Sequence, residues 1–253
     1  MPAHPSPSSA QRAVPAVDAR GARPRVLAVA HRGDPYRHRE NTLASVASAL
    51  AAGADAVEVD VRLTRDGVPV LLHDRTLERL WGDPRPLASV TLDQLDAVGA
   101  GELRVPTLAA ALKAVADTPA ARLLIDLDAA APAAAAHAAV AGLGLADRVA
   151  WCGPVAAMLA VRELDDAAGI ALTWTQPRLP AAALLADLRP YWVNPPFGLV
   201  GPEFVAGAHE AGLAVSTWTA DLRRTMRRLR DCGVDSITSN RIAVLRSVLD
   251  GTR

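Results

Sequence analysis

The chain has 253 residues, of which 51% are hydrophobic and 21% are charged, and its 27 basic side chains are balanced by 27 acidic ones. This composition excludes a highly charged disordered protein, and no stretch approaches the roughly 18 uninterrupted apolar residues of a membrane span. Zero net charge and 4% aromatic residues argue against a surface that binds nucleic acid. We therefore expect a globular protein without stable membrane insertion and without a nucleic-acid partner.

The composition along the chain indicates where the folded domain begins, and the cysteines indicate the compartment in which the protein works. Residues 1–24 are rich in Pro, Ser and Ala and lack the apolar core of a secretory signal, so we expect a disordered lead-in there. We expect 25–253 to form one domain, with a small insertion at about 74–104. Cys152 and Cys232 lie in apolar or amphipathic segments without metal-ligand spacing, which indicates thiols in a reducing compartment and predicts a cytoplasmic protein.

From Arg25 onward, short β-branched runs alternate with longer amphipathic segments, a pattern typical of strand and crossover-helix units around a parallel sheet. Eight such strands that close on themselves make a (β/α)₈ TIM barrel, an α/β fold whose active site lies at the C-terminal strand ends. An open doubly wound sheet is the alternative. The predicted strands are 26–30, 56–60, 123–127, 149–152, 170–174, 192–194, 214–218 and 236–238. Predicted helices include 42–52, with Asn41 as its N-cap, 107–116, 129–141, 202–211 and 222–232.

A second β-rich run, 68–72, follows the second predicted strand after only four residues. Parallel strands need a long crossover, so these two must form an antiparallel hairpin that extends from the barrel. If the turn is centred between Arg65 and Asp66, Glu58 lies opposite His73 and Asp60 lies opposite Leu71. Alternation along the strands then places Glu58, Asp60 and His73 on one face.

Carboxylates gather where predicted strands end. Glu58 and Asp60 lie at the end of the second strand, and Asp126 lies at the end of the third. Hard divalent cations prefer carboxylate oxygens, so these three residues predict a Mg²⁺ or Ca²⁺ site. Taken singly, each could equally be a strand carboxylate that faces solvent.

Two histidines and two further strand-end residues complete the candidate chemistry. Hydrolysis of a phosphodiester needs a base, an acid and positive charge on the phosphoryl group, which His31, His73 and Arg32 could supply. Taken singly, a histidine is more often a packing residue than a catalyst, and the convergence of both favours catalysis. Trp218 either belongs to the core or offers a flat apolar face to the carbon skeleton of a glycerol or sugar.

Several short motifs follow one another along the first half of the chain. They are Ala30-His31-Arg32-Gly33, Glu40-Asn41-Thr42, Glu58-Val59-Asp60-Val61, Asp66-Gly67 and His73-Asp74. In order and spacing, these motifs resemble the glycerophosphodiester phosphodiesterase family. The likeness continues more loosely to about residue 249 through Val193-Asn194-Pro195, Trp218-Thr219 and Gly233-Val234-Asp235.

This resemblance implies a metal-dependent TIM-barrel enzyme that cleaves small-molecule glycerophosphodiesters to sn-glycerol 3-phosphate and an alcohol. It makes His31 and His73 the acid–base pair in either order, with Arg32 on the phosphate and Trp218 on the substrate. The implied ligands of Mg²⁺ or Ca²⁺ are Glu58, Asp60 and Asp126, and Glu40 and Asp128 are further candidates for the site. Likeness to phosphoinositide phospholipases suggests that the glycerol 2-hydroxyl attacks first and gives a cyclic phosphate.

The sequence departs from the family pattern at two places. The third strand of the family usually carries Glu-x-Lys, whereas this chain has Asp126-Leu127-Asp128, which lowers the local charge by two. Asp128 could add a metal ligand, or Arg178 could supply the missing cation. Asn240 stands where an aspartate is common, and we expect it to be structural. The lost lysine keeps open the alternative of a barrel that binds diesters without cleaving them. A second alternative is a lysophospholipase D-like enzyme, which needs an apolar groove that the segment 87–98 and Trp81 could form. Oligomeric state is left open.

Overall fold

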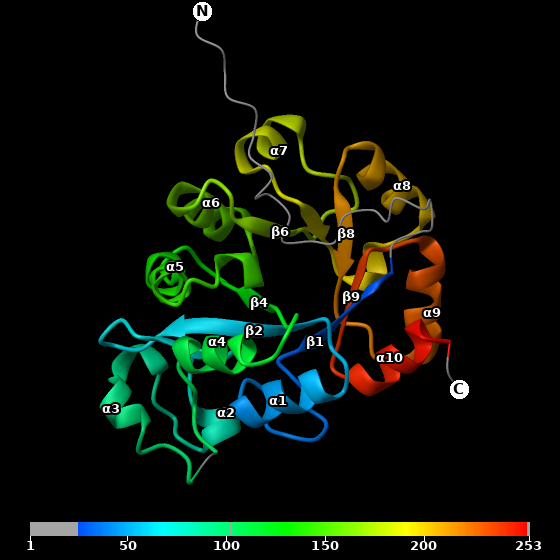
Figure 1. Cartoon of the computed structure of the whole chain (residues 1–253). Helices are drawn as coiled ribbons and strands as arrows, with labels where there is room; N and C mark the ends of the chain where they lie inside the picture. Colours follow the sequence, from blue (N-terminus) through cyan, green and yellow to red (C-terminus); the bar gives the residue numbers. More distant parts are fainter. Residues whose placement is uncertain (1–24, 102, 252–253) are drawn as a thin grey trace, which may run out of the picture.

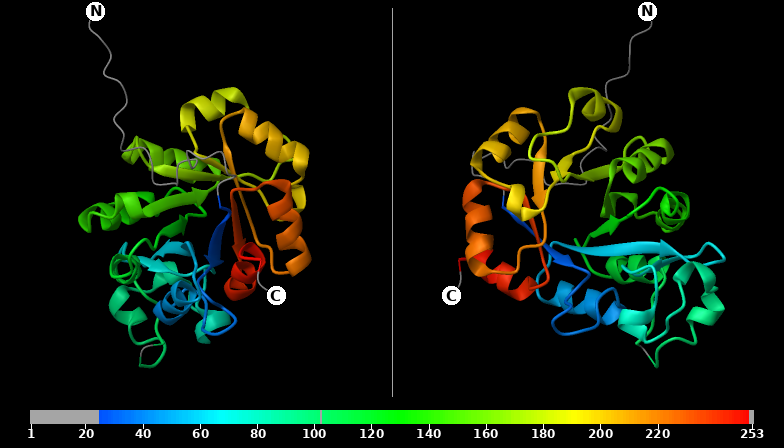
Figure 2. Two further views of the ribbon diagram at one scale, coloured as in Figure 1. Left: turned by 45° about the vertical axis from the view of Figure 1, so that its right-hand side comes forward. Right: turned by 180° about the vertical axis from the view of Figure 1, so that it is seen from behind.

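Eight parallel strands form the centre of the computed structural model, which describes residues 25–101 and 103–251. They are β1 (Leu27–His31), β2 (Ala56–Leu63), β4 (Leu123–Asp126), β5 (Val149–Gly153), β6 (Gly169–Thr173), β7 (Trp192–Asn194), β8 (Ala214–Thr217) and β9 (Ser236–Ser239). Each strand pairs with its neighbour, and β1 pairs with both β9 and β2, which closes the sheet (Figures 1 and 2). The predicted (β/α)₈ barrel is therefore confirmed, and the open sheet is wrong.

Helices surround this barrel and bury one face against it (Figure 1). In α4, for example, Leu108, Ala111, Leu112 and Val115 recur at helical spacing and are all buried. The helices of the described residues are α1 (Leu43–Ala51), α2 (Glu78–Trp81), α3 (Leu92–Leu95), α4 (Leu108–Ala116), α5 (Ala133–Gly142), α6 (Val155–Leu164), α7 (Ala182–Leu188), α8 (Pro202–Glu210), α9 (Arg223–Cys232) and α10 (Ile242–Leu249).

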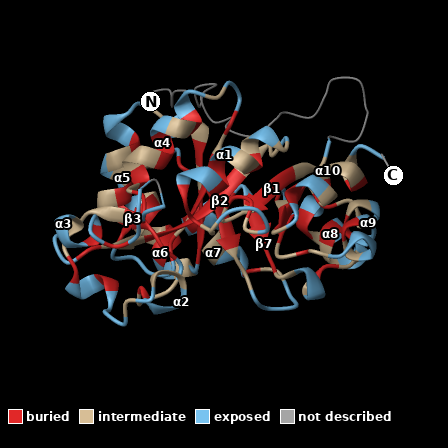
Figure 3. Cartoon of the chain, turned by 90° about the horizontal axis from the view of Figure 1, so that it is seen from below, coloured by how far each residue is buried: buried red, intermediate tan, exposed pale blue. Residues whose placement is uncertain are grey.

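Buried residues concentrate on the strands and on the helix faces that meet them (Figure 3). Inside the barrel, a small apolar cluster consists of Val29, Leu124, Cys152, Ala171 and Trp192. Side chains alternate between the two faces of a strand, so Asp126 points to the same side as Leu124 but lies one step nearer the C-terminal end. The apolar cluster thus forms a floor beneath the polar residues at the strand ends.

The short strand β3 (Pro69–Leu71) pairs antiparallel with β2, as the sequence predicted, but the register differs by one residue. Val61 lies opposite Leu71, and the next backbone N–H, of Leu72, donates to the carbonyl of Asp60 at 3.0 Å. The predicted pairings of Asp60 with Leu71 and of Glu58 with His73 are therefore wrong.

The shift arises in the turn. Thr64 and Val68 close a three-residue loop, and Gly67 at its end has a φ of +79°. A type I turn followed by a left-handed residue is a common three-residue hairpin connection, and it is centred on a residue rather than between two. His73 consequently lies just beyond the end of β3.

The described residues of the segment 74–104 pack beside the barrel around a small core of their own. Its buried members include Leu77, Leu87, Val90, Leu95 and Val98, which pack with Val70, Leu72 and Val105. Helix α2 lies next to the loop between β1 and α1, where the Arg39 guanidinium stands 4.5 Å from the centre of the Trp81 ring. The insertion therefore contacts a loop that borders the C-terminal end of the barrel.

Three further expectations concern the ends, the membrane and the thiols. The predicted lead-in at 1–24 lies outside the described residues. Across 25–101 and 103–251, no helix combines the length and the hydrophobicity that a membrane crossing requires. Cys152 and Cys232 are both free thiols.

Candidate active site

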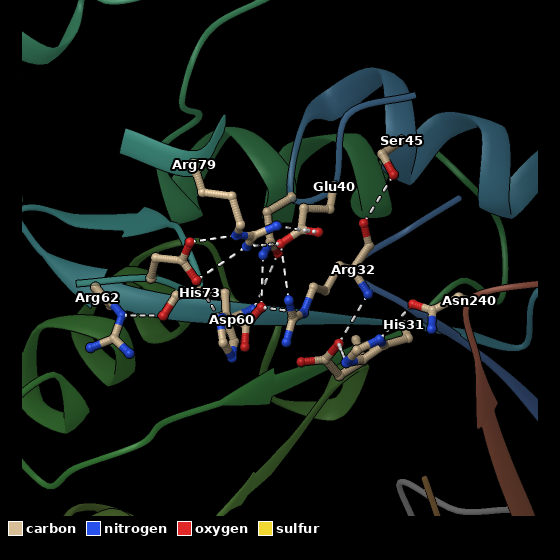
Figure 4. Close-up of polar contacts among 12 residues, drawn as sticks. His31, Arg32, Glu40, Ser45, Asp60, Arg62, His73, Arg79 and Asn240 are labelled. Atoms are coloured by element: carbon tan, nitrogen blue, oxygen red, sulfur yellow. Dashed lines mark hydrogen bonds and ion pairs between the residues drawn. The ribbon is translucent and has the colours of Figure 1, made fainter. Parts of the chain in front are cut away.

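A pocket opens at the C-terminal ends of the barrel strands, the end at which barrels of this class hold their active sites. Figure 4 shows that polar side chains from β1, β2 and the segment after β3 converge there. The structure brings eight of the predicted site residues into the lining of this pocket: His31, Arg32, Glu58, Asp60, His73, Asp126, Asp128 and Trp218. The ninth, Glu40, lies behind Arg32.

Three carboxylates from the neighbouring strands β2 and β4 form one cluster in this pocket. Glu58, Asp60 and Asp126 each offer one oxygen, and these oxygens lie within 4.8 Å of one another. Burial and the nearby acids raise the pKa of Asp126 to about 7 and the pKa of Glu58 well above its usual range. Such crowding suits a divalent cation, because a bound cation replaces mutual repulsion by attraction.

Asn41 orients one of these carboxylates. Helix α1 begins with Thr42 as its N-cap, whose side chain accepts the N–H of Ser45, so the prediction of Asn41 as the cap is wrong. Asn41 is buried instead, and its Nδ2 donates to Oδ2 of Asp60 at 2.7 Å. The backbone N–H of Asp60 donates in turn to Oδ1 of Asn41 at 3.2 Å. This pair of hydrogen bonds fixes where the Asp60 carboxylate points.

Arg32 follows β1 and lies beside two of the cluster's acids. Its φ of +57° turns the backbone so that its N–H donates to Oε2 of Glu58 at 3.0 Å. Its guanidinium donates from Nη1 to Glu40 at 2.9 Å, and its Nε lies 3.0 Å from Oδ2 of Asp60 without the alignment of a hydrogen bond. Arg32 therefore brings a fixed positive charge to the edge of the cluster.

His31 is held in one tautomer by a residue from the far end of the chain. The Asp221 carboxylate accepts from Nδ2 of Asn240 at 2.8 Å, so Oδ1 of Asn240 faces Nδ1 of His31 at 2.7 Å. Because that oxygen can only accept, Nδ1 carries the proton and Nε2 is left to take one. Nε2 lies 3.8 Å from Oε2 of Glu58. Burial, with a smaller effect of the Arg32 charge, lowers the pKa of His31.

His73 is held in the same tautomer by its sequence neighbour. Nδ1 of His73 lies 2.7 Å from Oδ1 of Asp74, which makes Nδ1 the protonated nitrogen and leaves Nε2 for proton exchange. Hydrogen bonds from Arg79 lower the pKa of Asp74 to about 2, so this acceptor stays ionised. The pocket thus holds two imidazoles whose Nε2 atoms are both set up to exchange protons.

The arrangement matches a known family. Residues 31–244 fit the model of the Glycerophosphoryl diester phosphodiesterase family. The chain belongs to this family. A Mycobacterium tuberculosis protein named Probable glycerophosphodiester phosphodiesterase 2 is 31% identical over 248 residues, which cover 88% of this chain and 90% of that protein. The resemblance inferred from the sequence motifs is confirmed, and the chain is a phosphoric diester hydrolase by family.

Two solved structures of phosphodiesterases share the fold of this family member. One from Silicibacter pomeroyi has a TM-score of 0.83 and 27% identity, with 92% of this chain and 95% of that chain covered. A phosphodiesterase of Oleispira antarctica, solved in complex with the product sn-glycerol-3-phosphate, has a TM-score of 0.81 and 21% identity, with 89% and 97% covered.

The departure from the family at β4 has a structural counterpart on β2. Asp128, which stands where the family usually has lysine, lies with Oδ2 2.8 Å from Nη2 of Arg62. Arg62 also lines the pocket and donates from Nε to the carbonyl of His73 at 2.6 Å. Asp128 is not in the carboxylate cluster. Arg178 is exposed, and its backbone carbonyl accepts from Nε1 of Trp174 at 2.6 Å.

Four residues that contact the site were missed or undervalued from the sequence. Arg62, Arg79 and Asp221 had no pattern that marked them, because their partners lie elsewhere in the chain. Asn240 was expected to be structural, and the structure places it directly against His31. Its deviation from the family's aspartate was the one available signal.

Proposed function

We propose that the chain is a metal-dependent phosphodiesterase that hydrolyses glycerophosphodiesters to sn-glycerol 3-phosphate and an alcohol. The observation that carries this proposal is the pairing of two Nδ1-protonated histidines with a cluster of three carboxylates in one pocket. A pocket that only bound diesters would have no use for a matched pair of proton-transfer groups. The family membership and the product complex of the Oleispira antarctica relative support the same reaction.

The residues that would hold the metal are Glu58, Asp60 and Asp126. Their oxygen donors suit a hard cation such as Mg²⁺ or Ca²⁺, and their close spacing with raised pKa values fits a site that loses its repulsion on cation binding. When bound, such a cation supplies positive charge that favours the developing charge on the phosphoryl oxygens. The buried contacts of Asn41 keep the Asp60 oxygen directed at this site.

The two histidines would divide the proton transfers. One Nε2 would accept the proton of the glycerol 2-hydroxyl as it attacks phosphorus, and the other, in its protonated form, would donate a proton to the oxygen of the departing alcohol. Water would then open the cyclic phosphate, with the two proton transfers reversed, to give sn-glycerol 3-phosphate. Asn240 accepts from Nδ1 of His31 and Asp74 accepts from Nδ1 of His73, which leaves each Nε2 available for proton transfer. Arg32, anchored by Glu40, would contact the phosphate, and the Trp218 ring would pack against the glycerol carbons.

The proposal is tested by measuring glycerol 3-phosphate release from glycerophosphocholine and glycerophosphoethanolamine in the presence of Mg²⁺, Ca²⁺ or EDTA. We expect metal-dependent turnover that is lost in His31→Ala and Glu58→Ala. Matched controls are His137→Ala on α5 and Glu163→Ala on α6, which lie away from the pocket and should retain activity. Absence of turnover on either diester, with the metal still bound, would favour a binding protein. Lysophosphatidylcholine is assayed in parallel by choline release, and turnover of this substrate alone would favour the lysophospholipase D-like alternative.

A further inference from the structure

Arg79, on the insertion helix α2, contacts two carboxylates at once. It donates from Nη1 and Nη2 to the two oxygens of Glu40 at 3.2 and 2.7 Å. It also donates from Nε and Nη2 to the two oxygens of Asp74 at 2.5 and 3.1 Å. Both contacts are therefore bidentate, the geometry in which a guanidinium holds a carboxylate most firmly.

The oxygens that Arg79 binds are the ones that reach the catalytic site. Oε1 of Glu40 accepts from Nη2 of Arg79 and also from Nη1 of Arg32 at 2.9 Å. Oδ1 of Asp74 accepts from the same Nη2 and is also the partner of Nδ1 of His73. Nη2 of Arg79 is thus linked to Arg32 through Glu40 and to His73 through Asp74. Figure 4 shows Arg79 in this position between the two sides of the site.

We propose that Arg79 is a positioning residue, which through Glu40 fixes the Arg32 guanidinium and through Asp74 holds the tautomer and orientation of His73. This inference rests on the proposed function, in which Arg32 and His73 act on the substrate. It assigns a role to the insertion as well, because α2 is held by the buried side chain of Leu77 and by the packing of Trp81 under Arg39. The insertion thereby supplies a support that the barrel itself does not provide.

The charges explain why an arginine is needed at this place. Glu40 and Asp74 would otherwise be free to turn toward Arg32 and His73 in several ways, since each has a single partner on that side. Burial raises the pKa of Glu40, but the hydrogen bonds from Arg79 and the charge of Arg32 outweigh it and leave the pKa lowered. Both acids consequently remain ionised acceptors. A lysine could satisfy one carboxylate but lacks the planar fork that binds both.

The experiment compares the wild-type enzyme with Arg79→Ala, Arg79→Lys and the control Arg85→Ala, an arginine of the same insertion that pairs with Asp83. Two kinds of measurement are made. Steady-state kinetics give kcat and KM on glycerophosphocholine at saturating metal, and NMR gives the long-range ¹H–¹⁵N signals of the His73 ring at a pH where the ring is neutral. For Arg79→Ala we expect kcat to fall about 10- to 100-fold, which is typical for a residue that holds an active-site side chain in place by a hydrogen bond. We also expect the His73 ring to show a mixture of tautomers.

Arg79→Lys should recover part of the lost kcat, and Arg85→Ala should match the wild type in both measurements. Wild-type kcat together with a wild-type His73 spectrum in Arg79→Ala would overturn the inference. An equal loss in Arg85→Ala would also overturn it, because Arg79 would then only anchor the insertion. If Arg79→Ala fails to fold, Arg79→Lys and Arg79→Gln give the same comparison. If the wild type cleaves no diester, the proposed function fails, whereas the His73 spectra still decide the role of Arg79.

Discussion

Asp128 at the end of β4 and Arg62 on β2 form an ion pair, with Oδ2 and Nη2 2.8 Å apart, at the edge of the active-site pocket. In the family pattern, the position of Asp128 usually carries the cation itself. Here Arg62 lies on the neighbouring strand, and Asp128 together with the carbonyl of His73 holds its guanidinium in place. We predict that Arg62 takes over the role of the missing cation, although the two positions lie 66 residues apart in the chain.

The first prediction follows from this exchange. Arg62→Ala should lower kcat/KM about 10- to 100-fold, because the pocket then lacks a positive charge on this side. This loss is no larger than that caused by removing one preorganised hydrogen-bond donor from an active site. Asp128→Lys alone should also be impaired, since it places a second cation beside Arg62. The double variant Arg62→Ala/Asp128→Lys should be more active than either single variant. Steady-state kinetics test this, with the exposed turn residue Arg65→Ala as the control.

The exchange idea fails if the double variant is no better than Arg62→Ala. In that case a cation at position 128 does not replace Arg62. If Arg62→Ala also keeps the wild-type kcat/KM, the ion pair serves only to join β2 to the segment that follows β4.

The second prediction concerns stability without metal. Asp126 has a folded-state pKa of about 7, raised by burial and by Asp60, against about 3.9 in an unfolded chain. Between pH 4 and pH 7, Asp126 therefore keeps its proton in the folded state and has lost it in the unfolded state. The stability that protonated Asp126 contributes is fully present below pH 4 and is lost as the pH rises toward 7. In EDTA, the unfolding temperature should fall across this window.

Mg²⁺ or Ca²⁺ should raise the unfolding temperature again above pH 7, because the cation binds the deprotonated acids. Asp126→Asn should flatten the pH dependence in EDTA and weaken the response to metal, whereas Asp93→Asn, on the exposed side of α3, should change neither. Thermal unfolding monitored by circular dichroism measures both effects. A wild-type profile in Asp126→Asn would show that Asp126 does not carry this proton.

The fold was largely predictable because its signals are local. Seven of the eight barrel strands were expected within one residue of their observed bounds, since β-branched runs and helical spacing recur along the chain. The exception is β2, which runs three residues beyond its predicted end. The hairpin register failed for an equally local reason. Whether a turn is centred on a residue or between two depends on Gly67 adopting a left-handed conformation, and the turn residues allow either.

The site was predictable only in part, because its support comes from residues far apart in the chain. His31, Glu58 and Asp126 were placed correctly, since polar residues at the ends of parallel strands must meet at one end of a barrel. Asn240 lies 209 positions from His31 and became a partner only through closure of β9 onto β1. Asn41 looked like a helix cap, and nothing in its neighbourhood revealed its contact with Asp60.

The third prediction concerns the tautomer of His31. Asn240→Ala removes the acceptor at Nδ1, so the ring can place its proton on either nitrogen and kcat should fall about 10- to 100-fold. Asp221→Ala should have a weaker effect in the same direction, because Asn240 can then rotate its amide. Kinetics and ¹⁵N shifts of the His31 ring measure the two consequences. The neighbouring exposed residue Arg241→Ala is the control, and a single unchanged tautomer in Asn240→Ala would contradict the assignment.

The fourth prediction concerns the turn that follows β1. Gly33 has a φ of +87°, and a Cβ there would lie 2.6 Å from the backbone carbon of Ser45 and 2.7 Å from its carbonyl oxygen. The same turn holds Arg32, whose carbonyl accepts from the Ser45 hydroxyl at 2.9 Å. Gly33→Ala should therefore cost about 2–5 kcal/mol of unfolding free energy, from the left-handed backbone and the overlap together, and should also lower kcat by displacing Arg32.

Gly67→Ala separates the two contributions. Gly67 has a similar φ of +79°, but a Cβ there meets nothing within 4 Å. Its loss should be limited to about 1–2 kcal/mol for the left-handed backbone, with kcat unchanged. Urea unfolding measures both free energies. Equal losses in the two variants would mean that α1 moves away from the turn without cost, and the close approach of Gly33 to Ser45 would then not be what fixes Arg32 beside Glu58.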